Sequence, residues 1–231
     1  LLASQAVGKS RAYNLLMSQD VLSAIDSIKK LGIKVKITDN YCEIYGNGIN
    51  GFKYKKNLQL NAKNSGTLAR LILGLLIKSP LKVKLIGDNS LSKRDFLRVT
   101  LPLEKFGAKF YYKKRGRLPL SILGSKSVKG INYFENKGSA QCKSSVMLAA
   151  LSASGTTSIK AKKSRNHSEL LFKYLKIPIK VKITKKYDFI DIKPPRKIPA
   201  FNYQIPGDIS SSAFFVALTT LANDSILLIK N

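Results

Sequence analysis

The stretch VLSAIDSIKKLGIKVKITDNYCEIYG, residues 21–46, combines the two periodicities that decide the fold. Apolar residues recur at helical spacing over Val21–Leu31, and the part from Ile33 to Gly46 then alternates between apolar and polar residues, as the two strands of a hairpin do. Asp39 and Asn40 are turn formers and stand at the expected bend. The stretch therefore predicts an amphipathic helix followed by a β-hairpin.

The same succession of helix and hairpin occurs twice more along the chain. Helical spacing recurs over Phe96–Phe106 and over Glu169–Leu175. An alternating stretch follows each of these segments, AKFYYKKRGRLPLSILG in the second copy and IKVKITKKYDFIDIK in the third. Their bends are expected at Arg115-Gly116 and at Lys185-Lys186. Three copies of one structural unit are therefore expected.

A short strand and a second helix follow each hairpin, and the second helix opens on small and polar residues. The three openings are Asn64-Ser65-Gly66-Thr67, Gly138-Ser139-Ala140-Gln141 and Gly207-Asp208-Ile209-Ser210-Ser211. They recur at intervals of roughly 70 residues, longer than the repeat of a solenoid protein. The sequence thus predicts an α/β (α+β) protein built from a duplicated subdomain of strand, helix, hairpin, strand and helix.

The first residues contain a loose match to a nucleotide-binding loop, ASQAVGKS at Ala3–Ser10. Such a loop requires a buried strand before it and a helix after it. The repeat predicts the reverse order here, because the corresponding segments of the other copies run from a helix into a strand. We therefore interpret Gly8 as a helix C-terminal glycine, and expect Lys9 and Ser10 to begin a strand.

Composition excludes several classes of protein. The chain has 231 residues, of which 44% are hydrophobic, enough for a substantial core. Its longest apolar run, Leu71–Ile77, is far shorter than the ~20 residues of a membrane span. The only two cysteines, Cys42 and Cys142, are too few for a disulfide framework, which favours a reducing, cytoplasmic location.

The formal net charge of +28 raises the possibility of nucleic-acid binding. However, the 41 basic residues include only eight arginines, and the lysines are spread over every segment. No zinc-finger, RNP or helix-turn-helix spacing occurs. We therefore expect a lysine-rich, solvated surface and no nucleic-acid partner.

The helix openings are candidate anion sites, because free backbone N–H groups and the helix dipole favour negative charge. The corresponding loops of the other half of the repeat carry further donors: Lys93 and Arg94 in GDNSLSKRD, and Ser164, Arg165 and His167 in KKSRNHSE. An arginine fork suits a phosphate or a carboxylate. A cation near a helix start is unusual for a purely structural role, which favours ligand binding.

At these residues the sequence resembles the 5-enolpyruvylshikimate-3-phosphate synthases, a family of enolpyruvyl transferases. The matching segments occur in the family's order along nearly the whole chain: NSGTLAR (64–70), GDNSLSKRDFLRV (87–99), GSAQCKSS (138–145), SRNHSE (164–169) and IPGDISSSAFF (205–215). The resemblance implies two domains of βαβαββ units, each an inside-out α/β barrel-like structure, with a ligand cleft between them. Residues 1–203 would form most of the first domain, and 204–231 would begin the second.

The resemblance also implies the reaction and its ligands. The family joins the 5-hydroxyl of shikimate 3-phosphate to C2 of phosphoenolpyruvate through a tetrahedral intermediate that expels phosphate, without metal or cofactor. Gly66, Arg94 and Gln141 look like phosphoenolpyruvate contacts. Ser139, Ala140, Gln141, Ser164 and Arg165 look like shikimate 3-phosphate contacts. His167 is more consistent with a structural or neighbouring role than with that of the general base.

The family's other functional groups have no counterpart in this sequence. A Lys-Ser-…-Arg stretch would precede Leu1, and an acidic pair with further Lys and Arg would follow Asn231, so we expect a piece of a longer chain that is incomplete for catalysis. A monomer is expected. Two alternatives remain: a UDP-N-acetylglucosamine enolpyruvyl transferase, although the reactive cysteine common in the loop after Gly87 is missing, and a non-catalytic basic protein that binds polyanions with salt-sensitive affinity.

Overall fold

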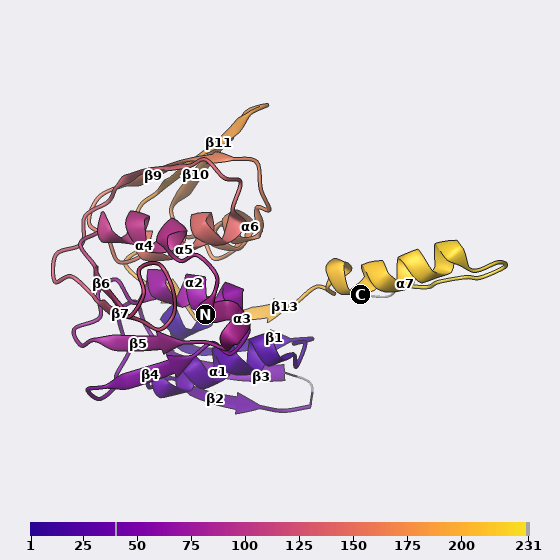
Figure 1. Cartoon of the computed structure of the whole chain (residues 1–231), viewed down its shortest axis with the longest axis horizontal. Coiled ribbons are helices and arrows are strands. Elements are labelled where there is room, and N and C mark those ends of the chain that lie inside the picture. The colour runs from indigo at the N-terminus through magenta and orange to yellow at the C-terminus, as the bar shows by residue number, and fades with distance from the viewer. Residues whose placement is uncertain (40, 230–231) are drawn as a thin grey trace.

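The computed structural model describes residues 1–39 and 41–229 as a mixed α/β protein with three β-sheets and seven α-helices (Figure 1). One sheet has five strands and the other two have four. The predicted α/β class is therefore confirmed. None of the helices in the described part of the chain is both long and apolar enough to cross a membrane.

The second sheet belongs to the segment from residue 58 to residue 123. Its elements are β4 (Leu58–Asn61), α2 (Gly66–Leu75), β5 (Val83–Ile86), the short α3 (Asn89–Ser92), α4 (Leu97–Glu104), β6 (Lys109–Tyr112) and β7 (Leu120–Leu123). The strand order is β4-β5-β7-β6; β4 pairs parallel with β5, β7 pairs antiparallel with β5, and β6 pairs antiparallel with β7. Because β4 and β5 are parallel, the loops that follow them leave the same edge of the sheet.

The third sheet, from residue 132 to residue 192, has the same construction. Its elements are β8 (Asn132–Glu135), α5 (Ala140–Ala150), β9 (Thr157–Lys162), α6 (His167–Tyr174), β10 (Ile179–Ile183) and β11 (Tyr187–Ile192). The order β8-β9-β11-β10 repeats that of the second sheet element by element, again with a parallel first pair. The helix starts of α2 and α5 therefore occupy corresponding places in the two units.

The first sheet combines the first strands of the chain with two short strands from residues 198–204. It contains β1 (Ala6–Tyr13), β2 (Lys34–Ile37) and β3 (Tyr41–Asn47), with β12 (Ile198–Pro199) and β13 (Asn202–Gln204) paired parallel to β1. The order β12-β1-β3-β2 places β12 where β4 and β8 stand in the other sheets. Helix α1 (Gln19–Lys30) connects β1 to β2, begins at the N-cap Ser18 and ends in lysines that complement its dipole.

The interpretation of Gly8 as a helix C-terminal glycine is wrong. The one-turn 3₁₀ helix Leu2–Gln5 ends on Ala6, whose backbone is already extended, and β1 begins there and not at Lys9. Gly8 lies inside the strand at φ +102°, opposite Gly46 of β3. Glycine is therefore used for a positive φ within a strand, which L residues rarely adopt. The predicted order of helix before strand is correct.

Two of the predicted hairpin bends lie between the strands that they were expected to connect. Arg115-Gly116 lies between β6 and β7, and Lys185-Lys186 lies between β10 and β11. For the bend at Asp39-Asn40, residue 40 lies outside the described residues.

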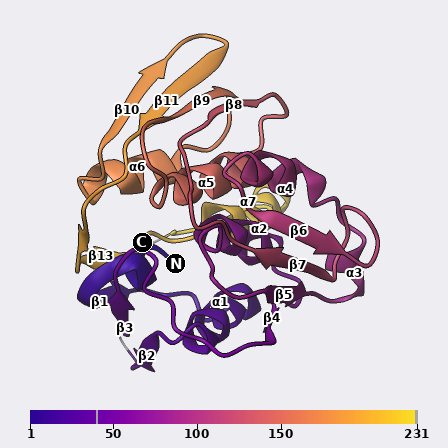
Figure 2. The same cartoon turned by 90° about the vertical axis from the view of Figure 1, so that its left-hand side faces the viewer.

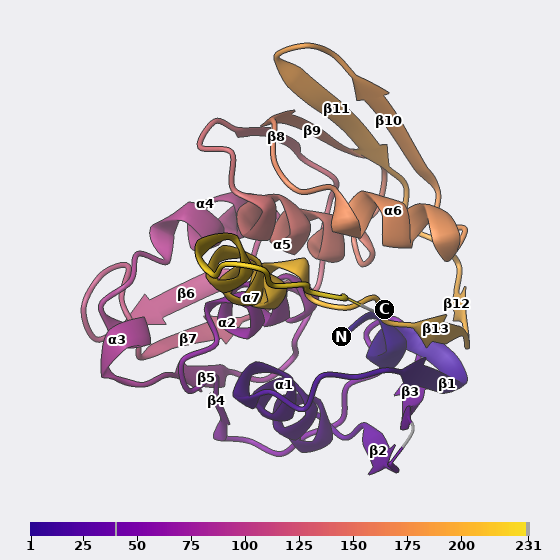
Figure 3. The same cartoon turned by 90° about the vertical axis from the view of Figure 1, so that its right-hand side faces the viewer.

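Helices α2 and α5 form the centre of the molecule, between the sheets (Figures 2 and 3). Every residue of α5 from Cys142 to Ala150 is buried, as expected for a helix surrounded by protein on all sides. The two helices approach closely at Gly74, where a Cβ would lie only 2.2 Å from the carbonyl oxygen of Ser145. In contrast, α7 (Ile209–Leu221) extends away from the body and has no buried residue (Figure 1).

Candidate functional site

The first turns of α2 and α5 lie side by side and are joined by Gln141. Its Nε2 donates a hydrogen bond of 2.8 Å to Oγ1 of Thr67, and its Oε1 accepts one of 3.0 Å from Arg70. Each helix begins at a serine N-cap, Ser65 or Ser139, whose hydroxyl accepts a backbone N–H of the first turn. The positive ends of two helix dipoles therefore face one region of space.

Arg94 reaches this region from the neighbouring loop. A Cβ placed on Gly66 would lie 2.7 Å from Nη1 of Arg70 and 3.0 Å from Nη1 of Arg94. Nη1 of Arg70 also donates to the carbonyl oxygen of Gly66 at 3.0 Å. The structure thus brings the three predicted phosphoenolpyruvate contacts, Gly66, Arg94 and Gln141, into one cluster. It adds Arg70, which the sequence analysis had quoted within NSGTLAR without giving it a role.

Asp88 holds the loop of Arg94 against the loop that opens α2. Its Oδ2 accepts a hydrogen bond of 2.5 Å from Asn64, and its Oδ1 caps α3 by accepting the N–H of Leu91 at 2.7 Å. Its own N–H donates to the carbonyl oxygen of Lys63 at 2.8 Å. The cap and the bond from Asn64 keep the pKa of the Asp88 carboxyl below its ordinary value.

The cluster carries an excess of positive charge. The pKa of Arg70 is lowered, mainly by partial burial and to a smaller extent by the nearby charges of Arg94 and Arg98. None of these three arginines forms an ion pair with a carboxylate among the described residues. An anionic ligand would relieve both the desolvation and the mutual repulsion.

The loop between β9 and α6 packs against the start of α5. A Cβ placed on Gly138 would lie 3.2 Å from the carbonyl oxygen of Lys163. Farther along α5, Lys143 donates from Nζ to the carbonyl oxygen of Arg165 at 3.0 Å. The predicted shikimate 3-phosphate contacts therefore gather around one helix start: Ser139, Ala140, Gln141, Ser164 and Arg165.

Two polar side chains in this loop, those of Ser164 and Arg165, have no hydrogen-bond or ion-pair partner among the described residues. Oγ of Ser164 is buried without a hydrogen-bond partner among the residues that the structure describes. Such a group costs about 1–3 kcal/mol unless something else satisfies it. Arg165 is exposed and forms no ion pair within the described part of the chain. His167 is the exposed first residue of α6. The loop thus offers a hydroxyl and a guanidinium to a ligand.

Glu135, which the sequence analysis missed, fixes the loop that leads into α5. It lies at the end of β8 and is 2% exposed. Its carboxylate accepts the backbone N–H of Ser139 at 2.8 Å and that of Lys137 at 3.2 Å. The only sequence signal that could have identified it is an acid at the end of a predicted strand, four residues before the serine that opens the next helix.

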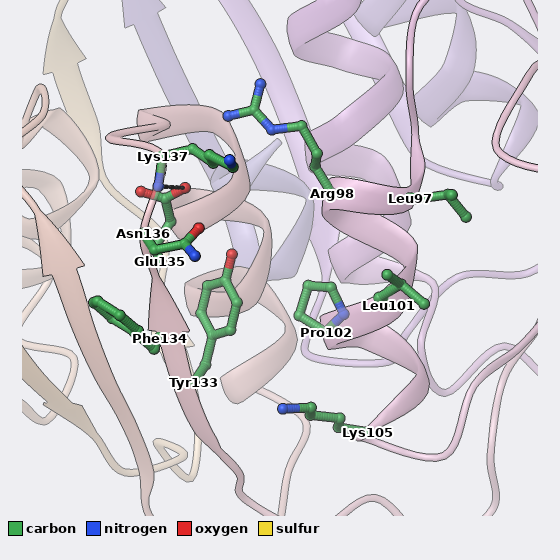
Figure 4. Close-up of a pocket in the computed structure, with 10 residues that line it drawn as sticks. All are labelled: Leu97, Arg98, Leu101, Pro102, Lys105, Tyr133, Phe134, Glu135, Asn136 and Lys137. Atoms are coloured by element: carbon green, nitrogen blue, oxygen red, sulfur yellow. Dashed lines mark hydrogen bonds between the residues drawn. The ribbon is translucent and has the colours of Figure 1, made fainter.

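A cavity of about 400 Å³ lies between α4 and β8 (Figure 4). Arg98 and Lys105 lie at its two ends, with Pro102 and Tyr133 between them. Burial raises the pKa of Tyr133. None of the seven predicted contact residues lines this cavity. Groups of three or more side chains suited to hold a metal ion do not occur in the described part of the chain.

The whole chain, residues 1–231, matches the family model described as EPSP synthase (3-phosphoshikimate 1-carboxyvinyltransferase). The 3-phosphoshikimate 1-carboxyvinyltransferase of Bacillus subtilis is 39% identical over 228 residues, which are 98% of this chain and 52% of the relative. That of Streptococcus mutans is 38% identical over 233 residues, 100% of this chain and 53% of the relative. The chain therefore spans about half the length of the curated relatives it matches.

A solved structure has the same fold. The 2.37 Å structure of the EPSP synthase of Acinetobacter baumannii superimposes with a TM-score of 0.83 at 31% identity. The match covers 94% of this chain and 48% of that structure. The family model, the curated relatives and the solved structure thus all indicate the same family.

Proposed function

Because the chain belongs to the EPSP synthase family, we propose that it forms the substrate-binding part of an enzyme that transfers the enolpyruvyl group of phosphoenolpyruvate to the 5-hydroxyl of shikimate 3-phosphate and releases phosphate. The observation that carries this proposal is the junction of α2 and α5, where Arg70, Arg94 and Gln141 surround two adjacent helix starts. Both substrates are anions that such a junction suits.

Phosphoenolpyruvate is assigned to Gly66, Arg94 and Gln141. The assignment is supported by Gly66, which has no Cβ and therefore lets an anion approach the first backbone N–H groups of α2. Nη1 of Arg94 lies near that backbone and has no carboxylate partner among the described residues. Arg94 would therefore pair with a carboxylate or phosphate of the ligand.

Shikimate 3-phosphate is assigned to Ser139, Ala140, Gln141, Ser164 and Arg165. The buried, unpartnered hydroxyl of Ser164 supports this assignment, because a ligand oxygen would satisfy it. Gln141 belongs to both sets, since its side chain lies between the two helix starts. The two ligands would meet there, which is where the bond between the 5-hydroxyl and C2 has to form.

The larger arrangement belongs to the same proposal. Residues 1–203 would form most of a first domain of βαβαββ units, arranged as an inside-out α/β barrel-like structure, and 204–231 would begin a second domain. The shared strand order of the sheets supports the units, and the exposed apolar side chains of α7, including Phe214 and Leu221, support a further domain that covers them. The proton-transfer groups would come from outside this chain. We propose a cytoplasmic monomer that uses neither metal nor cofactor.

The test is phosphate release by the full-length enzyme that contains this chain. The enzyme is mixed with phosphoenolpyruvate and one of three acceptors: shikimate 3-phosphate, shikimate or UDP-N-acetylglucosamine. We expect phosphate release with shikimate 3-phosphate only. Release with UDP-N-acetylglucosamine instead, or no release with any acceptor, would contradict the proposal.

A further inference from the structure

The central helix α5 contains a fully buried lysine. The side chain of Lys143 is 0% exposed, and its Nζ lies 2.5 Å from Oε1 of Glu169, whose side chain is 4% exposed. The same Nζ donates to the carbonyl oxygen of Arg165 at 3.0 Å. One ammonium group thus connects α5, the first turn of α6 and the loop that precedes α6.

Stability alone is a weak explanation for this ion pair. Removing two charges from water costs energy that their attraction often fails to recover, and apolar residues of similar volume are frequently as stable in such places. The pair is also incompletely satisfied, because Oε2 of Glu169 is buried without a hydrogen-bond partner in the described part of the chain. Lys143 moreover belongs to a helix whose other buried residues include the apolar Val146, Met147 and Leu148.

The position of Lys143 suggests what the pair does. Its backbone N–H bonds the carbonyl oxygen of Ser139, so the side chain leaves α5 one turn below the helix start. From there it bonds the backbone of Arg165. The hydroxyls of Ser144 and Ser168 form a further hydrogen bond of 2.6 Å between α5 and α6. The side chain of Lys143 therefore connects the beginning of α5 to the loop that carries Ser164 and Arg165.

We propose that Lys143 and Glu169 are positioning residues for shikimate 3-phosphate: their ion pair holds the Ser164–Arg165 loop against the start of α5, so that both halves of the binding site receive the ligand in one fixed geometry. This inference rests on the proposed function. The ammonium of Lys143 pairs with Glu169 and donates to the carbonyl of Arg165, and such a charge-assisted hydrogen bond is stronger than one from a neutral donor. Gly66 and Arg94, proposed for phosphoenolpyruvate, form no hydrogen bond or ion pair with Lys143 or Glu169 in the described part of the chain and should be unaffected.

The experiment compares three variants of the full-length enzyme: Lys143→Met, the double variant Lys143→Met/Glu169→Leu, and Val83→Ala as a control. Val83 is a buried residue at the start of β5 in the second sheet, whereas α6 and the loop before it belong to the unit of the third sheet. Melting temperature and the Michaelis constants for both substrates are measured for each. The single variant leaves a buried carboxylate without its partner and should melt at a lower temperature, whereas the double variant should recover most of that loss.

For the double variant we expect the Michaelis constant for shikimate 3-phosphate to stay raised by about tenfold or more, which corresponds to the loss of a charge-assisted hydrogen bond. The Michaelis constant for phosphoenolpyruvate should differ from that of the wild type by less than about twofold, which corresponds to ~0.4 kcal/mol of binding free energy. Val83→Ala should lower the melting temperature without this split between substrates.

Three results would overturn the inference. The double variant could have wild-type Michaelis constants, it could raise both constants equally, or it could fail to fold. Each of these results would give the ion pair a structural role only. A wild-type enzyme without phosphate release in the presence of shikimate 3-phosphate would instead refute the proposed function itself, so the two failures are distinguishable.

Discussion

The guanidinium of Arg70 donates a hydrogen bond of 3.0 Å to Oε1 of Gln141 and so joins the first turns of α2 and α5. The same group bonds the carbonyl oxygen of Gly66 and lies over the ring of Phe96, with its central carbon 5.2 Å from the ring centre. These contacts orient the guanidinium of Arg70 between the two helices. They fix the two helix starts relative to each other before any ligand arrives, which lowers the entropic cost of binding.

Replacing Arg94 or Arg165 by lysine should affect different substrates. Lysine keeps the charge but loses the fork-shaped pair of donors, which costs about 1–3 kcal/mol of ligand affinity. In the full-length enzyme, Arg94→Lys should raise the Michaelis constant mainly for phosphoenolpyruvate, and Arg165→Lys mainly for shikimate 3-phosphate. Steady-state kinetics with each substrate varied in turn measure both effects.

Arg196→Lys is the matched control for these variants, because Arg196 is exposed and lies outside the proposed site. It should leave both constants unchanged. If Arg94→Lys instead raised mainly the constant for shikimate 3-phosphate and Arg165→Lys that for phosphoenolpyruvate, the assignment would be wrong. If both variants only melted at a lower temperature, both arginines would be structural.

A methyl group at Gly66 should weaken phosphoenolpyruvate binding without unfolding the protein. Gly66 is the first residue of α2 and does not have a positive φ, so alanine fits the backbone and gains up to ~1 kcal/mol of helix propensity. The new Cβ would, however, displace the ends of Arg70 and Arg94, at 2.7 and 3.0 Å. We expect a raised Michaelis constant for phosphoenolpyruvate with an unchanged or higher melting temperature.

Gly74→Ala provides the contrast within the same helix. Its Cβ would meet backbone of α5 at 2.2 Å, which cannot move aside as an arginine side chain can. This variant should therefore lower the melting temperature. Gly66→Ala with unchanged phosphoenolpyruvate kinetics and a stable fold would remove Gly66 from the site.

Asp88 should give the protein a stability that disappears in acid. Its pKa is lowered by the N–H of Leu91 and the amide of Asn64, so ionised Asp88 stabilises the fold above the pKa of the unfolded chain, and this contribution is lost as the pH falls through the folded pKa. Asp88→Asn should therefore melt lower than the wild type at pH 7 and about equally below the folded pKa. An equal difference at all pH values would contradict the assigned cause.

Both thiols should be unreactive in the folded protein. Cys42 and Cys142 are each 2% exposed, and burial is the main cause that raises the pKa of each. Since the thiolate is the reactive form, a thiol reagent at neutral pH should label neither residue until denaturant is added. Rapid labelling of the native protein at either position would show that the helix start or β3 opens more readily than its packing indicates.

The helices and hairpins could be predicted because their sequences carry a local periodicity. The helix predicted over Val21–Leu31 is found at Gln19–Lys30, and all three openings predicted from small residues have a capping residue at their start: Ser65, Ser139 and Asp208. Such patterns arise within a few residues and survive folding, because one face of each element is buried.

The rest depends on contacts between residues distant in sequence. Lys143 pairs with Glu169, which lies on another helix, and Arg70 bonds Gln141, which lies in another unit. No local spacing in the sequence predicts either pair. Gly8 was misinterpreted for a related reason. Its positive φ is set by the pairing of β1 with β3, and a glycine after a helix is indistinguishable in sequence from a C-terminal cap.

The most direct test is to locate the bound ligand on the backbone. Amide signals of the isotope-labelled full-length enzyme are followed by NMR while shikimate 3-phosphate is added, with shikimate as the control that lacks the phosphate. We predict that the largest shifts fall on Ser139–Gln141 and on Ser164 and Arg165, and that shikimate produces much smaller ones. Shifts concentrated in the cavity between α4 and β8, or spread over the surface lysines, would contradict the site.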